Sequence, residues 1–229
     1  MGSTVFNRAG FASMDDLKSS RWKMLFDELE SFQSDFLMKE SEWRSKEYKW
    51  SNDPLHTCIR VWEYPFVYHH IKEWLRVYHS KDNPTQPVAV DLGSGVTFFP
   101  FAIQKYGCRV IAMDNDPICE SDYARMVKAF QLDSKSIQFK LGDAKNIPLP
   151  DNSVDCLYCI SVLEHIQNYQ DVIGEVARVL KPNGIFIITF DIDLKGNCEV
   201  GVEGLVQLKN RLTNMFDFRF PEIIVHPMD

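Results

Sequence analysis

The sequence predicts an α/β protein in which a mostly parallel, doubly wound sheet carries helices on both faces, preceded by an N-terminal helical cap. Two observations predict this fold class. From residue 88 onward, short apolar runs alternate with amphipathic segments, as in repeated strand–helix–strand units. Before residue 85, two stretches have the three- and four-residue apolar spacing of helices. We therefore expect a helical cap or lid over residues 1–84 and the sheet-containing core over residues 85–229.

The composition is that of an ordinary globular protein. The chain has 229 residues, enough for one generous domain or for a domain with an appended element. Its 32 acidic residues outnumber its 25 basic residues, and a mildly acidic surface argues against nucleic acid as the main partner. Because the sequence has neither a signal peptide nor an apolar run of about 20 residues, we expect a cytoplasmic protein without a membrane span. The oligomeric state is not indicated.

The six cysteines do not form a recognisable metal-binding or disulfide pattern. Cys156-Leu-Tyr-Cys159 has C-x-x-C spacing, but a zinc site would need a second pair, which the sequence lacks. That pair also falls within an apolar run that indicates a strand. We expect buried free thiols in a reducing compartment, and no metal. The six are Cys58, Cys108, Cys119, Cys156, Cys159 and Cys198.

The first predicted element is one long helix over residues 16–47, after a loose start over residues 1–15. Its apolar residues recur at helical spacing, while Lys, Glu and Ser fill the other face. These apolar residues are Leu17, Trp22, Leu25, Phe26, Leu29, Phe32, Phe36 and Leu37. The stripe is compatible with packing onto the core or with a lid over a ligand cleft.

The segment over residues 53–68 is unusually rich in aromatic residues for a connector. Pro54 and Pro65 punctuate it, and a second helix is predicted over residues 65–79. Arg60 and Tyr64 have two possible roles: they face a cleft and hold a carboxylate of substrate or cofactor, or they brace the helix against the sheet. Residues 81–87, which hold two prolines, form a loop and the boundary of the core.

The core elements follow in order. Strands are predicted over residues 88–92, 108–113, 137–141, 154–161 and 184–190, and helices over residues 99–105, 119–130, 169–180 and 202–215. Lys181-Pro-Asn-Gly184 is predicted as a turn. One further apolar run covers residues 222–226. If the sheet needs a closing hairpin, either the domain ends with a single extra strand or its C-terminal hairpin is incomplete.

Glycines and carboxylates at the ends of the predicted strands indicate a nucleoside site. In an open parallel sheet, ligands bind beyond the carboxyl ends of the strands. Gly93 and Gly95 follow the first strand, and Asp114 ends the second, where a carboxylate accepts the ribose hydroxyl protons. Asp143 follows the third strand, where an adenine amino group can donate to it. A G-x-G-x-x-G dinucleotide loop would need glycine at Phe98, which disfavours an NAD(P)-dependent oxidoreductase.

Six segments in this order resemble the class I S-adenosylmethionine-dependent methyltransferases, especially their small-molecule branch. They are Val90-Asp-Leu-Gly-Ser-Gly95, Ala112-Met-Asp-Asn-Asp-Pro117, Gly142-Asp-Ala144 with Ile147-Pro-Leu-Pro150, Asn152-Ser-Val-Asp155, Ser161-Val-Leu-Glu-His-Ile166, and Arg178-Val-Leu-Lys-Pro-Asn-Gly184. The resemblance covers about residues 85–190 and implies a Rossmann-like core. The chain departs from the pattern at Thr97, where many members have a third glycine.

The resemblance implies S-adenosylmethionine as cofactor and a role for each matched residue. Asp91 would orient the loop and the cofactor's amino group, Asp114 would hold the ribose, and Ser161 would lie near the methionine end. The full set of implied cofactor-binding residues is Asp91, Gly93, Ser94, Gly95, Asp114, Asn115, Asp143, Ala144 and Ser161.

Catalysis asks little of the protein, because the sulfonium already carries an activated methyl group. A base near neutral pKa helps a hydroxyl acceptor, and His165 is the best-placed candidate, with Glu164 orienting it. Alternatively, His165 packs against the following helix, or the two form a metal site. Asp191 and Asp193 follow the fifth strand and either lie at the cleft edge or are solvated loop carboxylates.

We expect a methyltransferase acting on a small-molecule acceptor, first a hydroxyl of a sugar or natural-product-like metabolite and second an amine. The alternative from another functional class is a non-catalytic module that binds S-adenosylmethionine as a scaffold or regulator.

Overall fold

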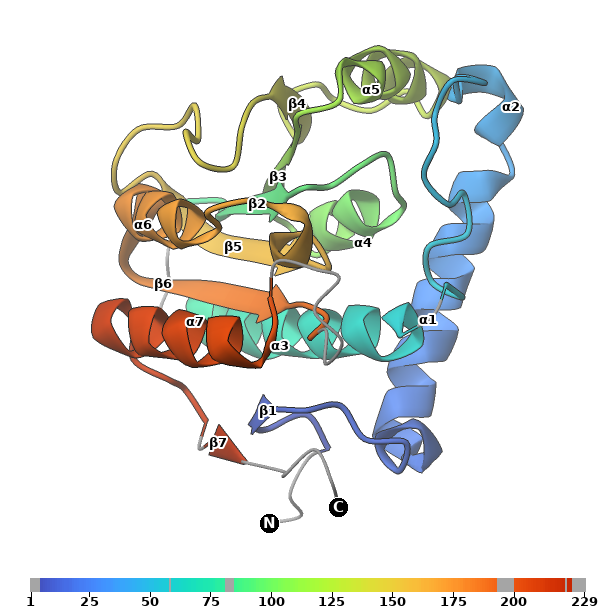
Figure 1. Ribbon diagram of the computed structural model, residues 1–229. Coiled ribbons are helices and arrows are strands. Elements are labelled where there is room, and N and C mark those ends of the chain that lie inside the picture. Colours follow the sequence, from blue (N-terminus) through green and yellow to red (C-terminus); the bar gives the residue numbers. More distant parts are fainter. Residues whose placement is uncertain (1–4, 58, 81–84, 193–199, 221, 224–229) are drawn as a thin grey trace.

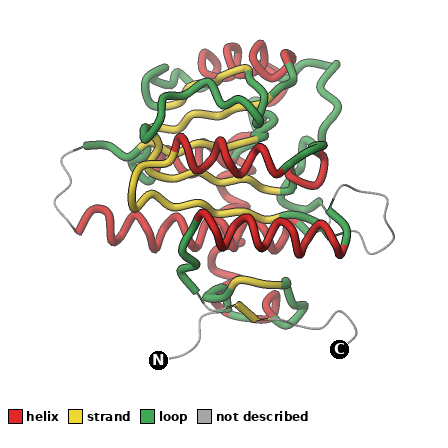
Figure 2. Tube along the Cα trace, turned by 60° about the vertical axis from the view of Figure 1, so that its left-hand side comes forward, coloured by secondary structure: helices red, strands yellow, loops and turns green. Residues whose placement is uncertain are grey.

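The computed structural model describes residues 5–57, 59–80, 85–192, 200–220 and 222–223. At its centre is a five-stranded sheet in the order β4-β3-β2-β5-β6, in which every neighbouring pair is parallel (Figure 1). Figure 2 shows the five strands side by side. The strands are β2 (Val88–Leu92), β3 (Arg109–Asp114), β4 (Ile137–Leu141), β5 (Val154–Ile160) and β6 (Leu180–Thr189).

Both faces of the sheet are covered, which explains why the inner strands β2, β3 and β5 are almost continuously apolar. Successive residues of a strand point to opposite faces, so Ala89 and Val90 belong to two different buried clusters. One cluster is completed by side chains of α1, α3, α4 and α5, and the other by α6 and α7. These helices are α1 (Ser20–Leu37), α3 (Arg60–Ser80), α4 (Phe99–Lys105), α5 (Pro117–Ala129), α6 (Gln170–Val179) and α7 (Val202–Met215). The predicted α/β, doubly wound, Rossmann-like fold is therefore confirmed.

The predicted turn over residues 181–184 is wrong, because β6 runs through it. Val154 pairs with Leu180 and Cys156 pairs with Ile185, so four residues of β6 lie opposite the single residue Asp155. Asn183 has a φ of 65° within this bulge. Lys181 Nζ contacts both carboxylate oxygens of Asp155, at 2.9 and 2.8 Å, which fixes the extra residues in place.

The predicted single helix over residues 16–47 is also wrong, since it is broken into three pieces. The 3-10 helix η1 (Asp16–Lys18) precedes α1, and α2 (Glu40–Trp43) follows it. The break turns the chain so that the Trp43 ring packs 4.7 Å from that of Phe36. Arg125 of α5 donates its Nε to the Trp43 carbonyl at 2.8 Å. Contacts with distant residues thus end α1 where its own sequence would continue.

Helix α3 begins at Arg60, five residues earlier than predicted, and contains Pro65. Proline lacks the N–H that would bond the carbonyl four residues before it, here that of Val61. The indole Nε1 of Trp22 donates to that carbonyl at 2.7 Å. A side chain of α1 therefore replaces the missing helical hydrogen bond and joins α1 to α3.

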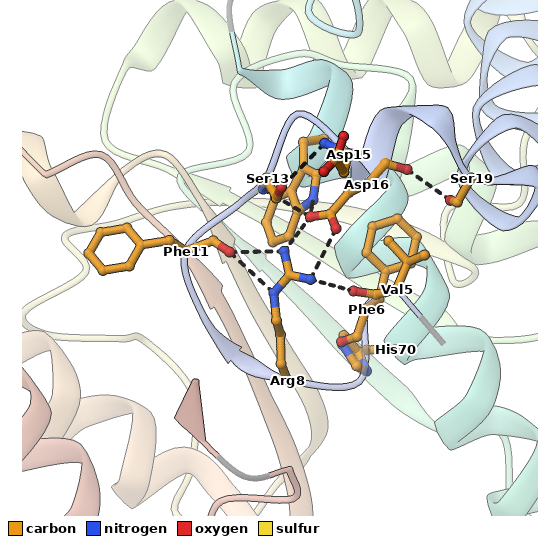
Figure 3. A network of polar contacts seen from close by, with 10 residues as sticks. Val5, Phe6, Arg8, Phe11, Ser13, Asp15, Asp16, Ser19 and His70 are labelled. Atoms are coloured by element: carbon orange, nitrogen blue, oxygen red, sulfur yellow. Dashed lines mark hydrogen bonds and ion pairs between the residues drawn. The ribbon is translucent and has the colours of Figure 1, made fainter. Parts of the chain in front are cut away.

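The N-terminal segment is tied down on α3 by a polar network around Arg8 (Figure 3). The Arg8 guanidinium donates to the carboxylate of Asp16 and to the Val5 and Phe11 carbonyls. Asp16 also accepts the indole N–H of Trp62 at 2.8 Å. A two-residue strand, β1 (Ala9–Gly10), pairs in parallel with β7 (Glu222–Ile223). The last predicted apolar run covers residues 222–226. Its first two residues form β7, and residues 224–226 lie outside the described residues.

The described cysteines, Cys108, Cys119, Cys156 and Cys159, are buried free thiols, as predicted; Cys58 and Cys198 lie outside the described residues. Among the described residues, no group of three His, Cys, Asp or Glu side chains is placed to hold a metal ion. Within the same residues, no helix combines the length and apolar character that crossing a bilayer requires. Residues 81–84 of the predicted boundary loop are likewise not described.

Candidate functional site

The order of strands reverses at β2, which has β3 on one side and β5 on the other. The glycine loop follows β2 at this point, where open α/β sheets bind their ligands. The N–H groups of Gly93 and Ser94 both donate to the Met113 carbonyl, at 2.8 and 3.0 Å. Gly93 has a φ of 76°, and a Cβ at this residue would lie 2.4 Å from Cγ2 of Val162 after β5. Glycine is therefore required by both backbone conformation and space.

Asp114, the predicted ribose ligand, is held by backbone N–H groups. Its Oδ2 accepts from Gly95 N at 2.8 Å and its Oδ1 from Asp116 N at 3.0 Å. The carboxylate therefore has a fixed direction and keeps further lone pairs for a ligand. Asn115 is exposed beside it.

The predicted adenine contacts lie at the adjacent strand end. Gly142 donates its N–H to the Asp114 carbonyl at 2.9 Å, which places the segment after β4 next to the end of β3. Asp143 is exposed and accepts the N–H of Lys145 at 2.8 Å, while Ala144 is half-buried. The Asp143 carboxylate is therefore bonded to backbone and exposed to solvent. Among the described residues, no basic side chain forms an ion pair with it.

Asp91 lies near the end of β2, buried beneath the glycine loop. Burial and the nearby charge of Asp114 raise its pKa, while Tyr158 and the Arg60 guanidinium oppose that rise. Ser94 is also buried, and its Oγ donates to the Gly95 carbonyl at 2.9 Å. Arg60, at the start of α3, is therefore close enough to Asp91 for its charge to act on that carboxyl.

Tyr64 lies near the same two groups, since the charges of Arg60 and Asp91 both affect the pKa of its hydroxyl. It is buried, with its ring 5.4 Å from Phe98 and 5.0 Å from Phe99, and burial raises the pKa of its hydroxyl. These ring contacts pack α3 against the start of α4.

Residues of the cap that sequence reasoning missed contact the glycine loop. The Tyr48 hydroxyl accepts the N–H of Val96 at 2.9 Å and would lie 2.6 Å from a Cβ at Gly95. Burial raises the pKa of Tyr48 to about 12. The Arg44 guanidinium lies between the rings of Trp43 and Tyr48, at 4.5 and 4.6 Å. No local signal could have identified Tyr48 and Arg44, because the Val96 backbone that both contact is about 50 positions away.

A third missed residue, Glu63, joins α3 to the end of β5. Its Oε2 accepts from the Ser161 Oγ at 2.7 Å, and the side chain is only 2% exposed. Burial raises the pKa of Glu63; Ser161, Thr189 and Arg60 oppose the rise, and Asp191 adds to it. Ser161 itself has a φ of 49°, an uncommon conformation for a serine.

The two predicted catalytic residues, His165 and Glu164, differ in solvent exposure. Both lie in the 3-10 helix η2 (Leu163–His165) directly after β5. His165 is exposed, whereas Glu164 is 2% exposed and accepts the Asp191 N–H at 3.3 Å through its Oε1. Burial, reinforced by Glu63 and Asp191, raises the pKa of Glu164 to about 7. Asp191 is exposed, and Asp193 lies outside the described residues.

Comparisons with known proteins agree with this geometry. Residues 90–188 match a family model described as a methyltransferase domain. Sterol 24-C-methyltransferase erg6 of Schizosaccharomyces pombe is 33% identical over 98 residues, which are 42% of this chain and 26% of that protein. Norajmaline N-methyltransferase of Rauvolfia serpentina is 32% identical over 124 residues, or 52% of this chain and 41% of that protein.

Among solved structures, the PH0226 protein from Pyrococcus horikoshii OT3 is 26% identical with a TM-score of 0.44, covering 72% of this chain and 69% of that one. The fold and the switch-point site define a nucleoside-binding α/β domain. Over residues 90–188 the chain is similar to the methyltransferase-domain family, and this similarity supports S-adenosylmethionine as the cofactor. It spans only about a quarter of the length of the sterol methyltransferases that it matches.

Proposed function

We propose that this chain transfers the methyl group of S-adenosylmethionine to a small-molecule acceptor, with Glu164 as the base. The observation that carries this proposal is the placement of Glu164, a buried carboxyl directly after β5 with a pKa of about 7. A general base is most effective when its pKa lies near the working pH. The exposed imidazole of His165 is less well protected from water, so the buried neighbour takes the role.

The residues around the glycine loop would hold the cofactor. Asp114 has the direction needed to accept ribose hydroxyls, and Gly93, Ser94 and Gly95 bring the backbone close. The adenine would lie near Asn115, Asp143 and Ala144, and the methionine end near Asp91 and Ser161. Each position follows from its strand end around the switch point.

We propose a hydroxyl on a sugar or natural-product-like metabolite as the first acceptor class and an amine as the second. A base with a pKa near 7 suits either nucleophile, because each must lose a proton in the course of transfer. The two curated relatives are named for methylation at carbon and at nitrogen, which supports a small-molecule acceptor.

We propose further that residues 1–84 act as a lid. Tyr48 and Arg44 contact the backbone of the glycine loop, at Val96, from the cap side. Bound cofactor would therefore be enclosed between the cap and the carboxyl ends of β2 and β5.

Calorimetric titration with S-adenosylmethionine and with NAD tests the cofactor, and a panel of hydroxyl and amine acceptors tests transfer. We expect heat with S-adenosylmethionine alone and a product heavier by one methylene unit. Binding of NAD in its place would overturn the proposal. Binding of S-adenosylmethionine without transfer to any acceptor would favour a scaffold or regulatory role.

A further inference from the structure

The edge of the sheet at β6 forms one wall of a long groove. Among the described strands, β6 is the last in the order and pairs with β5 alone. Helices α3 and α7 run along it, and the N-terminal segment around β1 lies below them in the view of Figure 1. All of these elements line the groove, which has a volume of about 1880 Å³. Small-molecule sites usually have volumes of ~300–1,000 Å³, so a large ligand has room here.

The lining of this groove is apolar along most of its length. Six of the twelve large apolar side chains that are exposed among the described residues lie in it. They come from the N-terminal segment, from α3 and the residue before it, and from α7 and the residues after it. Apolar surface gathered in a concave place is typical of a binding site. The six are Phe11, Ile59, Val77, Val206, Met215 and Phe218.

One end of the groove is polar and holds two buried oxygens without a partner. Glu63 and Thr189 both line the groove, and Ser161 bonds both of them. Its Oγ donates to Glu63 Oε2 at 2.7 Å, and its N–H donates to the Thr189 carbonyl at 3.1 Å. Within the described residues, Glu63 Oε1 and Thr189 Oγ1 make no hydrogen bond although both atoms are buried. Since buried polar atoms rarely lack a partner, these two indicate a polar ligand group at this end.

This polar end lies beside the proposed methyl-transfer site. Asp191, which also lines the groove, donates its backbone N–H to Glu164 Oε1 at 3.3 Å. Of the described residues, Glu164 and those of the glycine loop do not line the groove. The groove is therefore next to the cofactor site and separate from it. An acceptor must reach the methyl group from outside the cofactor's own site, so this position suits an acceptor.

The polar groups at this end favour a hydroxyl on the ligand. The carboxyl groups of Glu63 and Asp191 disfavour a carboxylate or a phosphate, because like charges repel. A hydroxyl both donates and accepts a hydrogen bond. It can therefore bond Glu63 Oε1 and Thr189 Oγ1 together, whether or not the Glu63 carboxyl holds a proton.

We propose that the groove binds an elongated apolar acceptor that ends in a hydroxyl. Its apolar part lies along β6 between α3 and α7, and its hydroxyl bonds Glu63 and Thr189. This inference rests on the proposed function and narrows its acceptor class, because a sugar would bring polar groups against the apolar lining. A long-chain alcohol is the simplest molecule with the required chemistry.

The first test is a calorimetric titration of the wild-type chain with unbranched primary alcohols from butanol to decanol, with and without S-adenosylhomocysteine. Each added methylene should tighten binding about fourfold, the value of one buried CH₂ group. Decanol should bind about three- to tenfold more tightly than its methyl ether, which cannot donate a hydrogen bond. Thr189→Val should reduce that preference. Affinity that does not depend on chain length would overturn the inference.

Two valines of α7 provide a matched pair for locating the bound alcohol. Val206 and Val202 are both 56% exposed, but only Val206 lines the groove. Val206→Glu should weaken decanol binding at least about tenfold, because it places a charge against the apolar chain. Val202→Glu should leave the affinity unchanged. Phe218→Ser, at a second exposed position in the groove, should also weaken binding. Equal affinities in all three variants and the wild type would contradict the proposed site.

Sedimentation of the wild-type chain tests whether a second copy occupies the groove instead. A stable dimer that does not bind decanol would overturn the inference. The proposed function can fail separately. If decanol binds as expected but S-adenosylmethionine does not bind, the groove remains a site for an apolar alcohol and the methyltransferase proposal fails. If methyl transfer to a polar acceptor is found while alcohol binding is independent of length, the proposed function stands and this inference fails.

Discussion

The two sides of the cleft hold their carboxylates in opposite ways. On the β2–β3 side, both oxygens of Asp114 accept backbone N–H groups, from Gly95 and Asp116. On the β5–β6 side, Glu63 and Glu164 each have one bonded oxygen and one without a partner in the described chain.

This difference suits one side of the site to holding the cofactor and the other side to proton transfer. A carboxylate oriented by backbone is already in its binding geometry, so little reorganisation is needed when the nucleoside arrives. Carboxyl groups that are buried and incompletely bonded have raised pKa values, and that of Glu164 reaches about 7, where it can exchange a proton near neutral pH. We infer that the β2–β3 side anchors the cofactor and that the β5–β6 side handles the reacting groups.

The largest expected effect is on turnover at the β5–β6 side. Glu164→Gln should slow methyl transfer by roughly 10²–10⁴-fold, the usual contribution of a general base. In the wild type, kcat should rise with pH through about 7, as the Glu164 carboxylate forms. The measurement is a pH profile of kcat with an acceptor from the panel. If His165→Ala slows methyl transfer more than Glu164→Gln does, the general base is the exposed imidazole of His165 instead.

The same carboxyl should make stability fall as pH rises. The pKa of Glu164 is about 7 in the folded chain against 4.5 for the unperturbed group. Between these values the folded state retains a proton that the unfolded state has lost. The free energy of unfolding should therefore decrease by roughly 3 kcal/mol between pH 4.5 and pH 7 on this account alone. Urea unfolding of wild type and Glu164→Gln at pH 5 and pH 8 measures it; parallel curves would contradict the raised pKa.

Two glycines with similar positive φ angles, Gly93 and Gly107, test whether the glycine loop depends on the space around its backbone. Gly93→Ala places a Cβ 2.4 Å from Val162, at a φ of 76°. We expect it to weaken S-adenosylhomocysteine binding by about 2–3 kcal/mol, because the loop must shift. Gly107→Ala has a similar φ of 88° but meets no atom within 4 Å. It should lose about 1 kcal/mol of stability and no affinity. Equal affinity losses would contradict the steric explanation.

Asp114→Ala should weaken the cofactor by roughly 1.5–3 kcal/mol, the range for hydrogen bonds to a charged group. Its neighbour Asp116 caps α5 by accepting the Ile118 N–H at 2.9 Å. Asp116→Ala is therefore expected to lower stability by about 1 kcal/mol and leave affinity unchanged. Calorimetric titration separates the two; an unchanged dissociation constant in Asp114→Ala would mean that the ribose is held elsewhere.

The smallest expected effect concerns the lid. Tyr48→Phe removes the acceptor of the Val96 N–H and should cost about 1 kcal/mol of affinity. Amide hydrogen exchange at Val96 should become faster in the variant. Unchanged exchange would show that Tyr48 does not restrain the loop.

Much of the core could be predicted from the sequence to the exact residue. β2, β4, α4 and α7 begin and end where their apolar patterns predict, because a strand or helix packed on a sheet has a strict local period. The proposed cofactor-binding residues were selected for a related reason. They follow directly after strands, and the carboxyl ends of parallel strands meet at one edge of the sheet.

The residues missed by sequence reasoning act through distant partners. Glu63 bonds Ser161, 98 positions away, and Tyr48 bonds Val96, 48 positions away. Glu63 also lies in a helix, where an acidic residue usually faces solvent. The break after Leu37 has a similar cause, because it depends on Trp43 packing against Phe36 and Arg125. No local period carries such information.

The most direct test is a crystal structure of this chain with S-adenosylhomocysteine bound. The account predicts that the nucleoside lies beyond the carboxyl end of β2, with its ribose hydroxyls hydrogen-bonded to Asp114. The sulfur should point toward Glu164 and the methionine end toward Ser161. Ligand bound away from the Gly93–Gly95 loop, or a ribose that does not contact Asp114, would contradict the division of the cleft into an anchoring side and a reacting side.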